Sequence, residues 1–178
     1  MGEKAEKAWV SASPELKISE EVDPKHASVT LRFVDIMGAA TPVPANCNGR
    51  GFYDLFHRNF IKLDLIQRGR IQCIFLVKPP LCNGYGTLHG GAIGSFVEIL
   101  ATACARTVVA EDKELFLGEM SASYLSGTPV NEEVLVDASV VKTGRNLTVV
   151  EVEFKLKKTG NLHYRTHATF YNMPVSSL

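Results

Sequence analysis

A glycine-rich loop that runs directly into a long apolar segment is the feature that most constrains how this chain folds. The loop is Asn83–Gly91, and Glu98 is the first charged residue and the only acid in the segment that continues to Ala110. Hydrophobic side chains fall on nearly every side of a helix drawn through this segment, which predicts a buried helix. A bare buried charge is costly, so Glu98 should be paired, hydrogen-bonded or protonated, and it is a candidate for catalysis. The alternatives are a structural hydrogen bond to Thr102 or a route to the surface.

The glycines of this loop favour a binding function at the start of the helix. Glycine has no Cβ, so its backbone can approach a bound molecule closely. A helix that begins at Gly90 or Gly91 would direct free N–H groups and the positive end of its dipole toward the loop. Such a place suits a polarised carbonyl oxygen or an anion. The alternative is that the glycines only form a tight turn into a core helix.

Strands are expected on both sides of the helix. Phe60–Gln67 and Ile71–Val77 flank a turn at Arg68–Arg70 and should form a hairpin. Beyond the helix the hydrophobic period changes to two, which is typical of half-buried antiparallel strands. The segments concerned are 117–126, 133–142, 148–157 and 162–171. The simplest arrangement is a hairpin, a buried helix and a four-stranded meander, which gives an α+β domain with a curved antiparallel sheet wrapped around the central helix.

The part of the chain before this domain is expected to be an extension. We assign residues 1–50 to an N-terminal extension with a short helix, and residues 51–178 to the domain. Asp23-Pro24 is an N-cap followed by proline at the first helical position, and apolar residues at helical spacing continue from there to Gly38. After a loop, Phe52–Phe56 restarts a short amphipathic helix.

Composition and charge exclude several classes of function. The chain has 19 basic and 19 acidic residues, and no basic stripe interleaved with aromatics predicts nucleic-acid binding. No apolar run is long enough to insert into a membrane. The cysteines are scattered, which favours reduced thiols and a cytoplasmic protein, although Ser176–Leu178 distantly resembles a peroxisomal address. His163 and His167 would lie about 13 Å apart in a strand, so no metal site is predicted.

The order of elements and the motif that precedes the helix resemble the hotdog-fold acyl-CoA thioesterases. The similarity is to the phenylacetic-acid-degradation-type and acyl-CoA thioesterase 13-like branch, and it covers roughly Phe52 to Tyr171. Its most specific part is the pattern Asn-x-x-Gly-Thr-Leu-His-Gly-Gly, followed by an acid seven residues after the last glycine. The resemblance implies a hotdog fold and hydrolysis of acyl-CoA with no cofactor and no metal.

The same resemblance implies roles for the residues of the motif. The backbone around His89 and Gly90 would polarise the thioester carbonyl, and Gly91 would belong to the same substrate-binding loop. Asn83 would help to hold substrate or water, while Glu98 would activate water or attack the carbonyl directly. Many relatives carry Asp at the position of Glu98.

A second motif and one departure come from the same comparison. The family's Lys-x-Gly-Lys/Arg-x-Leu turn, which lies against coenzyme A phosphates, matches Lys142, Gly144, Arg145, Asn146 and Leu147. A serine that orients water in the family falls near Leu117 or Gly118 here. The residue that positions water is therefore open.

Helix geometry independently predicts a site shared between subunits. Eight residues separate Gly90 from Glu98, which corresponds to a rise of about 12 Å. This is too far for the carboxylate to reach a carbonyl held at the start of the same helix. A second subunit would supply the acid, so we expect a homodimer. The family resemblance implies that two such dimers can pair into a homotetramer.

Three alternatives remain from the sequence. A hotdog hydratase or dehydratase would use a catalytic histidine beside an acid, and a non-catalytic acyl-CoA binding protein could use the same scaffold. A Cys82–His89 nucleophile would need a third group to orient it. Serine hydrolase chemistry finds little support because no Gly-x-Ser-x-Gly elbow occurs.

Overall fold

The computed structural model describes residues 16–36, 45–47 and 49–174. The chain divides into two units, Met1–Phe52 and Tyr53–Leu178. In the first, α1 (Pro24–Ile36) begins where the sequence predicts, and the Asp23 carboxylate accepts a hydrogen bond from the Lys25 amide at 2.7 Å. A short 3-10 helix, η1, spans Ala45–Cys47. The C-terminal Ser176–Leu178, on which the peroxisomal alternative rests, lies outside the described residues.

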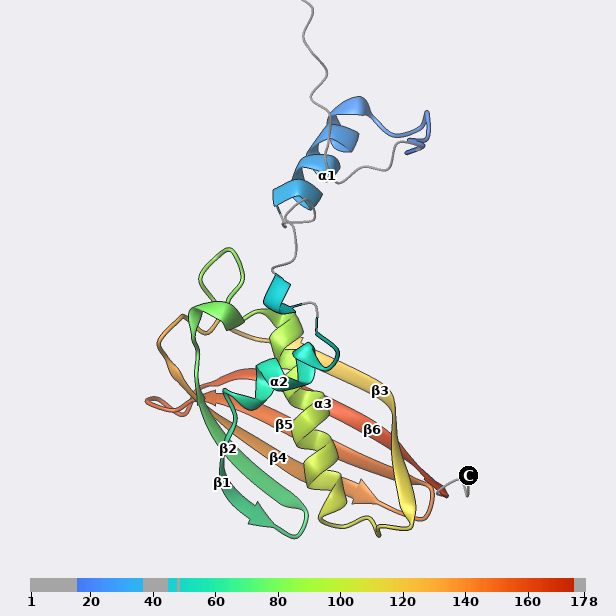
Figure 1. Cartoon of the computed structure of the whole chain (residues 1–178), viewed down its shortest axis with the longest axis vertical. Helices are drawn as coiled ribbons and strands as arrows, with labels where there is room; N and C mark the ends of the chain where they lie inside the picture. Colours follow the sequence, from blue (N-terminus) through green and yellow to red (C-terminus); the bar gives the residue numbers. More distant parts are fainter. Residues whose placement is uncertain (1–15, 37–44, 48, 175–178) are drawn as a thin grey trace, which may run out of the picture. The chain divides into compact units, whose positions relative to one another are not determined.

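The second unit is an α+β hotdog domain, as predicted. A six-stranded antiparallel sheet curves around one long helix, α3, with the short helix α2 beside it (Figure 1). In chain order the elements are α2 (Phe52–Arg58), β1 (Lys62–Gln67), β2 (Arg70–Leu76), η2 (Pro79–Leu81), α3 (Gly90–Arg106), β3 (Lys113–Tyr124), β4 (Glu133–Thr143), β5 (Leu147–Leu156) and β6 (Leu162–Pro174). None of the described helices is long and apolar enough to cross a membrane.

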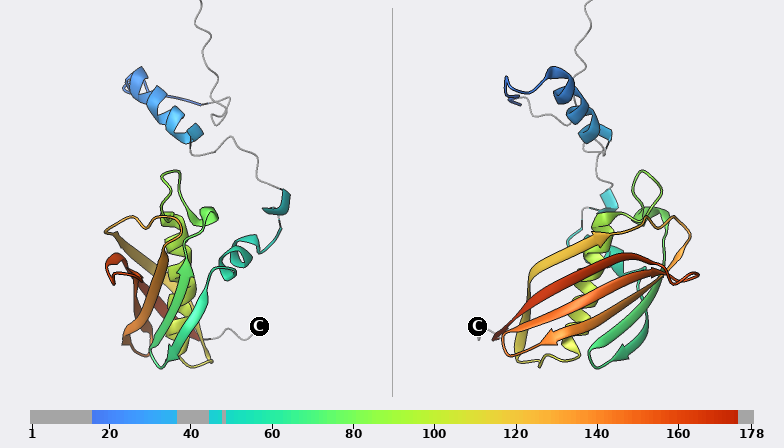
Figure 2. Two further views of the ribbon diagram at one scale, coloured as in Figure 1. Left: turned by 90° about the vertical axis from the view of Figure 1, so that its left-hand side faces the viewer. Right: turned by 180° about the vertical axis from the view of Figure 1, so that it is seen from behind.

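The order of strands in the sheet corrects one expectation. The order is β1-β2-β4-β5-β6-β3, so the predicted hairpin β1–β2 and the consecutive strands β4, β5 and β6 are confirmed. The four-stranded meander is wrong, because β3 pairs with β6 and not with β4. This places β3 at an edge of the sheet, on the far side from β1 (Figure 2). The next strand in sequence is therefore not its neighbour in space.

The core lies between α3 and the concave face of the sheet. Along β5 the even-numbered residues from Thr148 to Leu156 are buried, as the alternation predicts. From α3, Phe96 and Val97 are fully buried, and the Phe96 ring stacks on Phe75 of β2 at 4.6 Å between centroids. Burial of these rings and aliphatic side chains is the main force that holds the helix in the sheet.

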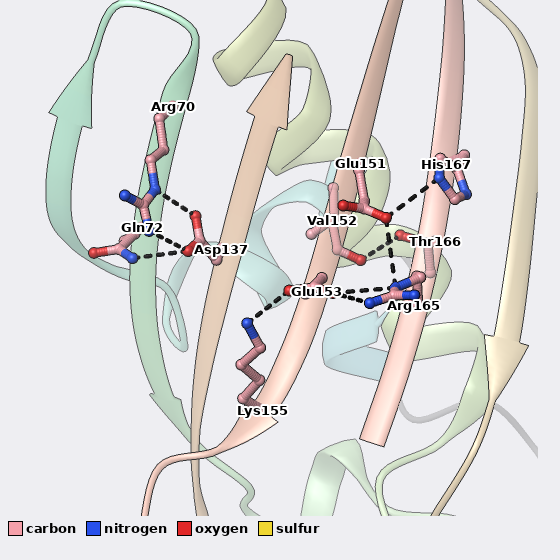
Figure 3. A network of polar contacts seen from close by, with 10 residues as sticks. All are labelled: Arg70, Gln72, Asp137, Glu151, Val152, Glu153, Lys155, Arg165, Thr166 and His167. Atoms are coloured by element: carbon pink, nitrogen blue, oxygen red, sulfur yellow. Dashed lines mark hydrogen bonds and ion pairs between the residues drawn. The ribbon is translucent and has the colours of Figure 1, made fainter. Parts of the chain in front are cut away.

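The convex face of the sheet carries a network of charged side chains (Figure 3). Arg70 makes an ion pair with Asp137 across β2 and β4 at 2.5 Å. On β5 and β6, Glu153 pairs with both Lys155 and Arg165. The hydrogen bond from Lys155, followed by that from Arg165, lowers the pKa of Glu153. The charged side chains of this network are therefore paired with one another, and we expect the active site on the concave side of the sheet.

Candidate active site

The loop before α3 is held by its own polar groups. The Asn83 side-chain oxygen accepts hydrogen bonds from the Tyr85 amide at 3.0 Å and the Thr87 amide at 3.2 Å. Gly86 has φ +74°, a conformation that favours glycine. Asn83, for which the family resemblance implies contact with substrate or water, thus uses its carboxamide to shape the loop.

His89 caps the N-terminus of α3 with its side chain. Its Nδ1 atom accepts a hydrogen bond from the Gly91 amide at 2.8 Å. A Cβ on Gly91 would lie only 3.1 Å from that nitrogen, so glycine leaves room for the cap. Within the described ranges the Gly90 amide has no hydrogen-bond partner. The cap therefore pairs the Gly91 N–H and leaves the Gly90 N–H free to donate.

The Gly90 end of the helix opens into a cleft of about 340 Å³. Tyr124, at the end of β3, forms one wall, with its hydroxyl 3.5 Å from the Gly90 carbonyl oxygen. This side chain is 58% exposed although it points to the concave face, because β3 is an edge strand. The sequence analysis missed Tyr124, and its only signal was its position on the inward phase of the β3 alternation.

Glu98 corrects the prediction of a helix buried on every side. Its side chain is exposed, as are Gly91 and Ile99, and together with the half-buried Ser95 and Thr102 it forms an open face of α3. Glu98 opens into a second cleft, of about 420 Å³, which lies between this face and α2. In one protomer the Gly90 donor and the Glu98 carboxylate therefore face different clefts.

The wall of the Glu98 cleft on the α2 side was also missed from the sequence. Tyr53 and Ser95 join α2 to α3 through a hydrogen bond between their hydroxyl oxygens at 3.0 Å. His57 is buried, and its ring packs edge-on against Phe96 with centroids 5.4 Å apart. The helical spacing of Tyr53 and His57 was the available signal, since four residues place both on one face of α2.

The cationic turn lies at the opposite end of α3 from Gly90. Lys142, Gly144, Arg145 and Asn146 are exposed and Leu147 is half-buried. The Gly69 backbone forms hydrogen bonds both to the C-terminal half of β4 and to the C-terminus of α3. It donates to the Thr107 hydroxyl at 2.7 Å and accepts from the Val140 amide at 2.8 Å. The 17 residues of α3 separate the turn from Gly90 by about 25 Å.

Neither of the two β3 positions near which the family serine falls, Leu117 and Gly118, carries a polar side chain. Leu117 packs against the core, and Gly118 forms a bulge in the β3–β6 pairing. The Tyr171 ring covers Gly118 so closely that a Cβ there would lie 2.2 Å from a ring carbon. A side chain at this position would therefore have to displace the ring.

The cysteine alternative also finds little support. The Cys82 thiol donates to the Lys78 carbonyl oxygen, and burial raises its pKa, so the nucleophilic thiolate is disfavoured. The His89 nitrogen that could act as a base is engaged by Gly91. Among the described residues, no group of three or more His, Cys, Asp or Glu side chains is placed to hold a metal ion.

Comparison with known proteins agrees with this architecture. The family model of the thioesterase superfamily matches residues 85–162, which include most of the loop, α3, the strands β3, β4 and β5, and the first residue of β6. The matched stretch lies within the hotdog domain. A crystal structure of zebrafish thioesterase superfamily member 2 superimposes with a TM-score of 0.65 at 23% identity, covering 72% of this chain and 91% of that one, which shows the shared fold.

Two curated relatives extend the comparison to sequence. Human acyl-coenzyme A thioesterase 13 is 28% identical over 109 residues, which cover 60% of this chain and 77% of the human protein. A Caenorhabditis elegans protein named as an esterase is also 28% identical over 109 residues, covering 61% of this chain. The match spans 64% of the worm protein, less than two thirds of its length.

Proposed function

We propose that this protein is an acyl-CoA thioesterase. The observation that carries the proposal is the Gly90 amide at the N-terminus of α3, which has no partner among the described residues and belongs to a residue that lines a cleft. An amide placed there stabilises the negative charge that develops on the oxygen during attack. The name of the human relative supports coenzyme A thioesters as the substrate class.

In the proposed reaction Glu98 acts as a general base or as a nucleophile. As a base it takes a proton from water, the oxygen attacks the thioester carbonyl, the carbon–sulfur bond breaks, and the proton passes to the sulfur of coenzyme A. As a nucleophile the carboxylate attacks the thioester carbonyl, and the carbon–sulfur bond breaks to release the coenzyme A thiolate. Water then cleaves the mixed anhydride, which restores the carboxylate, frees the acid and supplies the proton that the thiolate takes up. Both routes give the free acid and coenzyme A and need no metal or organic cofactor.

The two separate clefts support a site built from two protomers. The Glu98 carboxylate lies about 12 Å along the helix from Gly90 and opens on another side of the protomer. A two-fold axis that pairs antiparallel α3 helices would bring the Glu98 of one protomer to the Gly90 of the other. Such an axis passes near Gly94, the midpoint of the two positions, where an added Cβ would meet nothing within 4 Å.

The same pairing accounts for the position of the cationic turn. With α3 helices antiparallel, the turn of one protomer lies toward the Gly90 end of the other. We infer that Lys142 and Arg145 contact the phosphates of coenzyme A there, since lysine and arginine bind phosphate through charge-assisted hydrogen bonds. The homodimer, or a tetramer of two such dimers, is part of this proposal.

The test is release of free thiol from acyl-CoA esters, measured on the full chain and on Glu98→Gln. The substitution keeps size and removes the basic carboxylate, so kcat should fall by about a hundredfold or more. Glu111→Gln, at an exposed site in the loop after α3, is the matched control and should retain full activity. Tight acyl-CoA binding without thiol release would instead support a non-catalytic binding protein, the alternative favoured by Leu117 and Gly118 at the position of the family serine.

A further inference from the structure

His57 places one polar atom at the side of the Glu98 cleft. The residue is only 1% exposed, and its ring is surrounded by the aromatic side chains of Tyr53, Phe56 and Phe96 at centroid distances of 4.7–5.4 Å. Ile99 and Ala103 of α3 give this cleft an apolar part beside its polar residues Ser95, Glu98 and Thr102. A buried imidazole in such surroundings needs a partner for each of its ring nitrogens.

One ring nitrogen of His57 is satisfied, and its partner fixes the tautomer. Nδ1 lies 2.7 Å from the backbone carbonyl oxygen of Tyr53. A carbonyl oxygen only accepts hydrogen bonds, so Nδ1 carries the proton. In the neutral imidazole Nε2 is then an acceptor with a free lone pair.

The other nitrogen faces the cleft. Nε2 of His57 has no hydrogen-bond partner in the part of the chain that the structure describes. Every buried side-chain nitrogen or oxygen of the described residues does have a partner, so Nε2 must keep access to the outside. The open space that His57 lines is the Glu98 cleft. Nε2 of His57 is therefore an unpaired acceptor on the α2 side of the cleft, across from Glu98, Ser95 and Thr102 of α3.

We propose that this cleft binds an acyl group that carries a hydroxyl group, whose O–H donates to Nε2 of His57. The inference rests on the proposed function, because it places the acyl part of the substrate beside Glu98. An unsubstituted chain would leave Nε2 without a partner. An oxo group would also fail to pair with it, because a ketone oxygen is an acceptor like Nε2. The order of preference is hydroxyacyl first, with unsubstituted and oxoacyl groups behind it.

The experiment measures binding, so that it does not depend on turnover. Non-hydrolysable thioether analogues of octanoyl-CoA, with a hydroxyl or an oxo group at successive carbons, are titrated into the full chain by calorimetry. At least one hydroxyl isomer should bind about fivefold to tenfold more tightly than the unsubstituted analogue, the effect of one hydrogen bond. The oxo isomer at the same carbon should show no gain.

Two variants connect the preference to His57. His57→Asn keeps a donor for the Tyr53 carbonyl but has no atom at the position of Nε2, and His57→Phe keeps an aromatic ring with no polar atom. In each variant the hydroxyl preference should disappear while the affinity for the unsubstituted analogue stays within about twofold. If one variant does not fold, the other and the wild-type ranking still decide.

The outcomes separate this inference from the proposed function. Equal binding of all analogues to the wild type, or a hydroxyl preference that survives both variants, overturns the role of His57. Hydrolysis of octanoyl-CoA with no hydroxyl preference refutes this inference alone. A hydroxyl preference without hydrolysis of any ester refutes the thioesterase proposal and leaves the binding role of His57 intact.

Discussion

Removal of the His89 cap should weaken both the stability and the activity of the protein. In His89→Ala the Gly91 amide loses its acceptor at the N-terminus of α3. Loss of a helix N-cap costs about 1 kcal/mol of the free energy of unfolding. In a domain of this size that corresponds to a fall of about 3–4 °C in Tm.

The assay has to separate the cap from the imidazole itself. His89→Asn is the matched control, because the Asn side-chain oxygen can occupy the place of Nδ1 and accept from the Gly91 amide. Unfolding by heat and by urea is measured at one protein concentration, since a dimer makes Tm depend on concentration. The Asn variant should recover most of the lost stability.

The catalytic activity should also depend on the cap, because the cap fixes the position of the Gly90 amide. The cap holds the first turn of α3, and a shift of about 1 Å at the Gly90 donor can cost up to a hundredfold in rate. We expect kcat to fall about tenfold or more in His89→Ala and to recover in His89→Asn. Equal stability of His89→Ala and wild type would refute the capping role. Loss of activity in both variants, with stability recovered only by Asn, would show that the imidazole acts in the chemistry itself.

Three further predictions concern the charges and the cofactor requirement. Changing Lys142 and Arg145 together to Ala should raise KM for an acyl-CoA by about tenfold but leave KM for an acyl-pantetheine, which lacks the nucleotide, nearly unchanged. The control is the same change at Lys157 and Lys158, an exposed pair in the β5–β6 hairpin. An equal effect on both substrates would refute the contact of Lys142 and Arg145 with the phosphates. Dialysis against a chelator should leave thiol release unchanged, and restoration of lost activity by zinc would contradict the mechanism. Because the pKa of Glu153 is lowered in the folded state, its contribution to stability is present above the unfolded pKa and is lost as pH falls through the folded one. The free energy of unfolding of Glu153→Gln, measured with urea, should therefore depend less on pH in the acid range. The same pH dependence as in the wild type would contradict this prediction.

The sequence predicted most of the elements because their hydrophobic periods are strong. The alternation in β5 gave its inward face correctly, and the Asn83–Gly91 loop was placed at the start of α3. The order of the strands in the sheet was harder to predict, because strand pairing depends on the packing of the whole domain. The period of β3 is the same whether it lies beside β4 or β6, and only the fold decides that it lies beside β6.

The burial of Glu98 was wrong for a different reason. Counting apolar residues suggested a helix covered on all sides, but the few polar positions of α3 gather on one face with Ser95 and Thr102. A helical wheel weighted toward those positions would have indicated an open face. Local patterns give only the inward phase of Tyr124 on β3 and the shared face of Tyr53 and His57 on α2, and the clefts that these residues line depend on residues far away in the chain.

The most direct test of the shared site is a mixed dimer. One chain carries Glu98→Gln and the other carries Gly90→Pro, which deletes the proposed N–H donor. Proline is tolerated at the first position of a helix, and His89 already has the extended conformation that precedes proline, with φ −69° and ψ 134°. Each homodimer lacks one group at both of its sites and should be inactive.

In the purified heterodimer, one site combines an intact Gly90 amide from one chain with an intact Glu98 from the other. Two different affinity tags isolate this species, and thiol release is compared with that of wild type at equal concentration. A site shared between protomers predicts about half of the wild-type kcat, from one working site out of two. Folded heterodimers as inactive as the two parent homodimers would place the donor and the acid in the same chain and contradict the account.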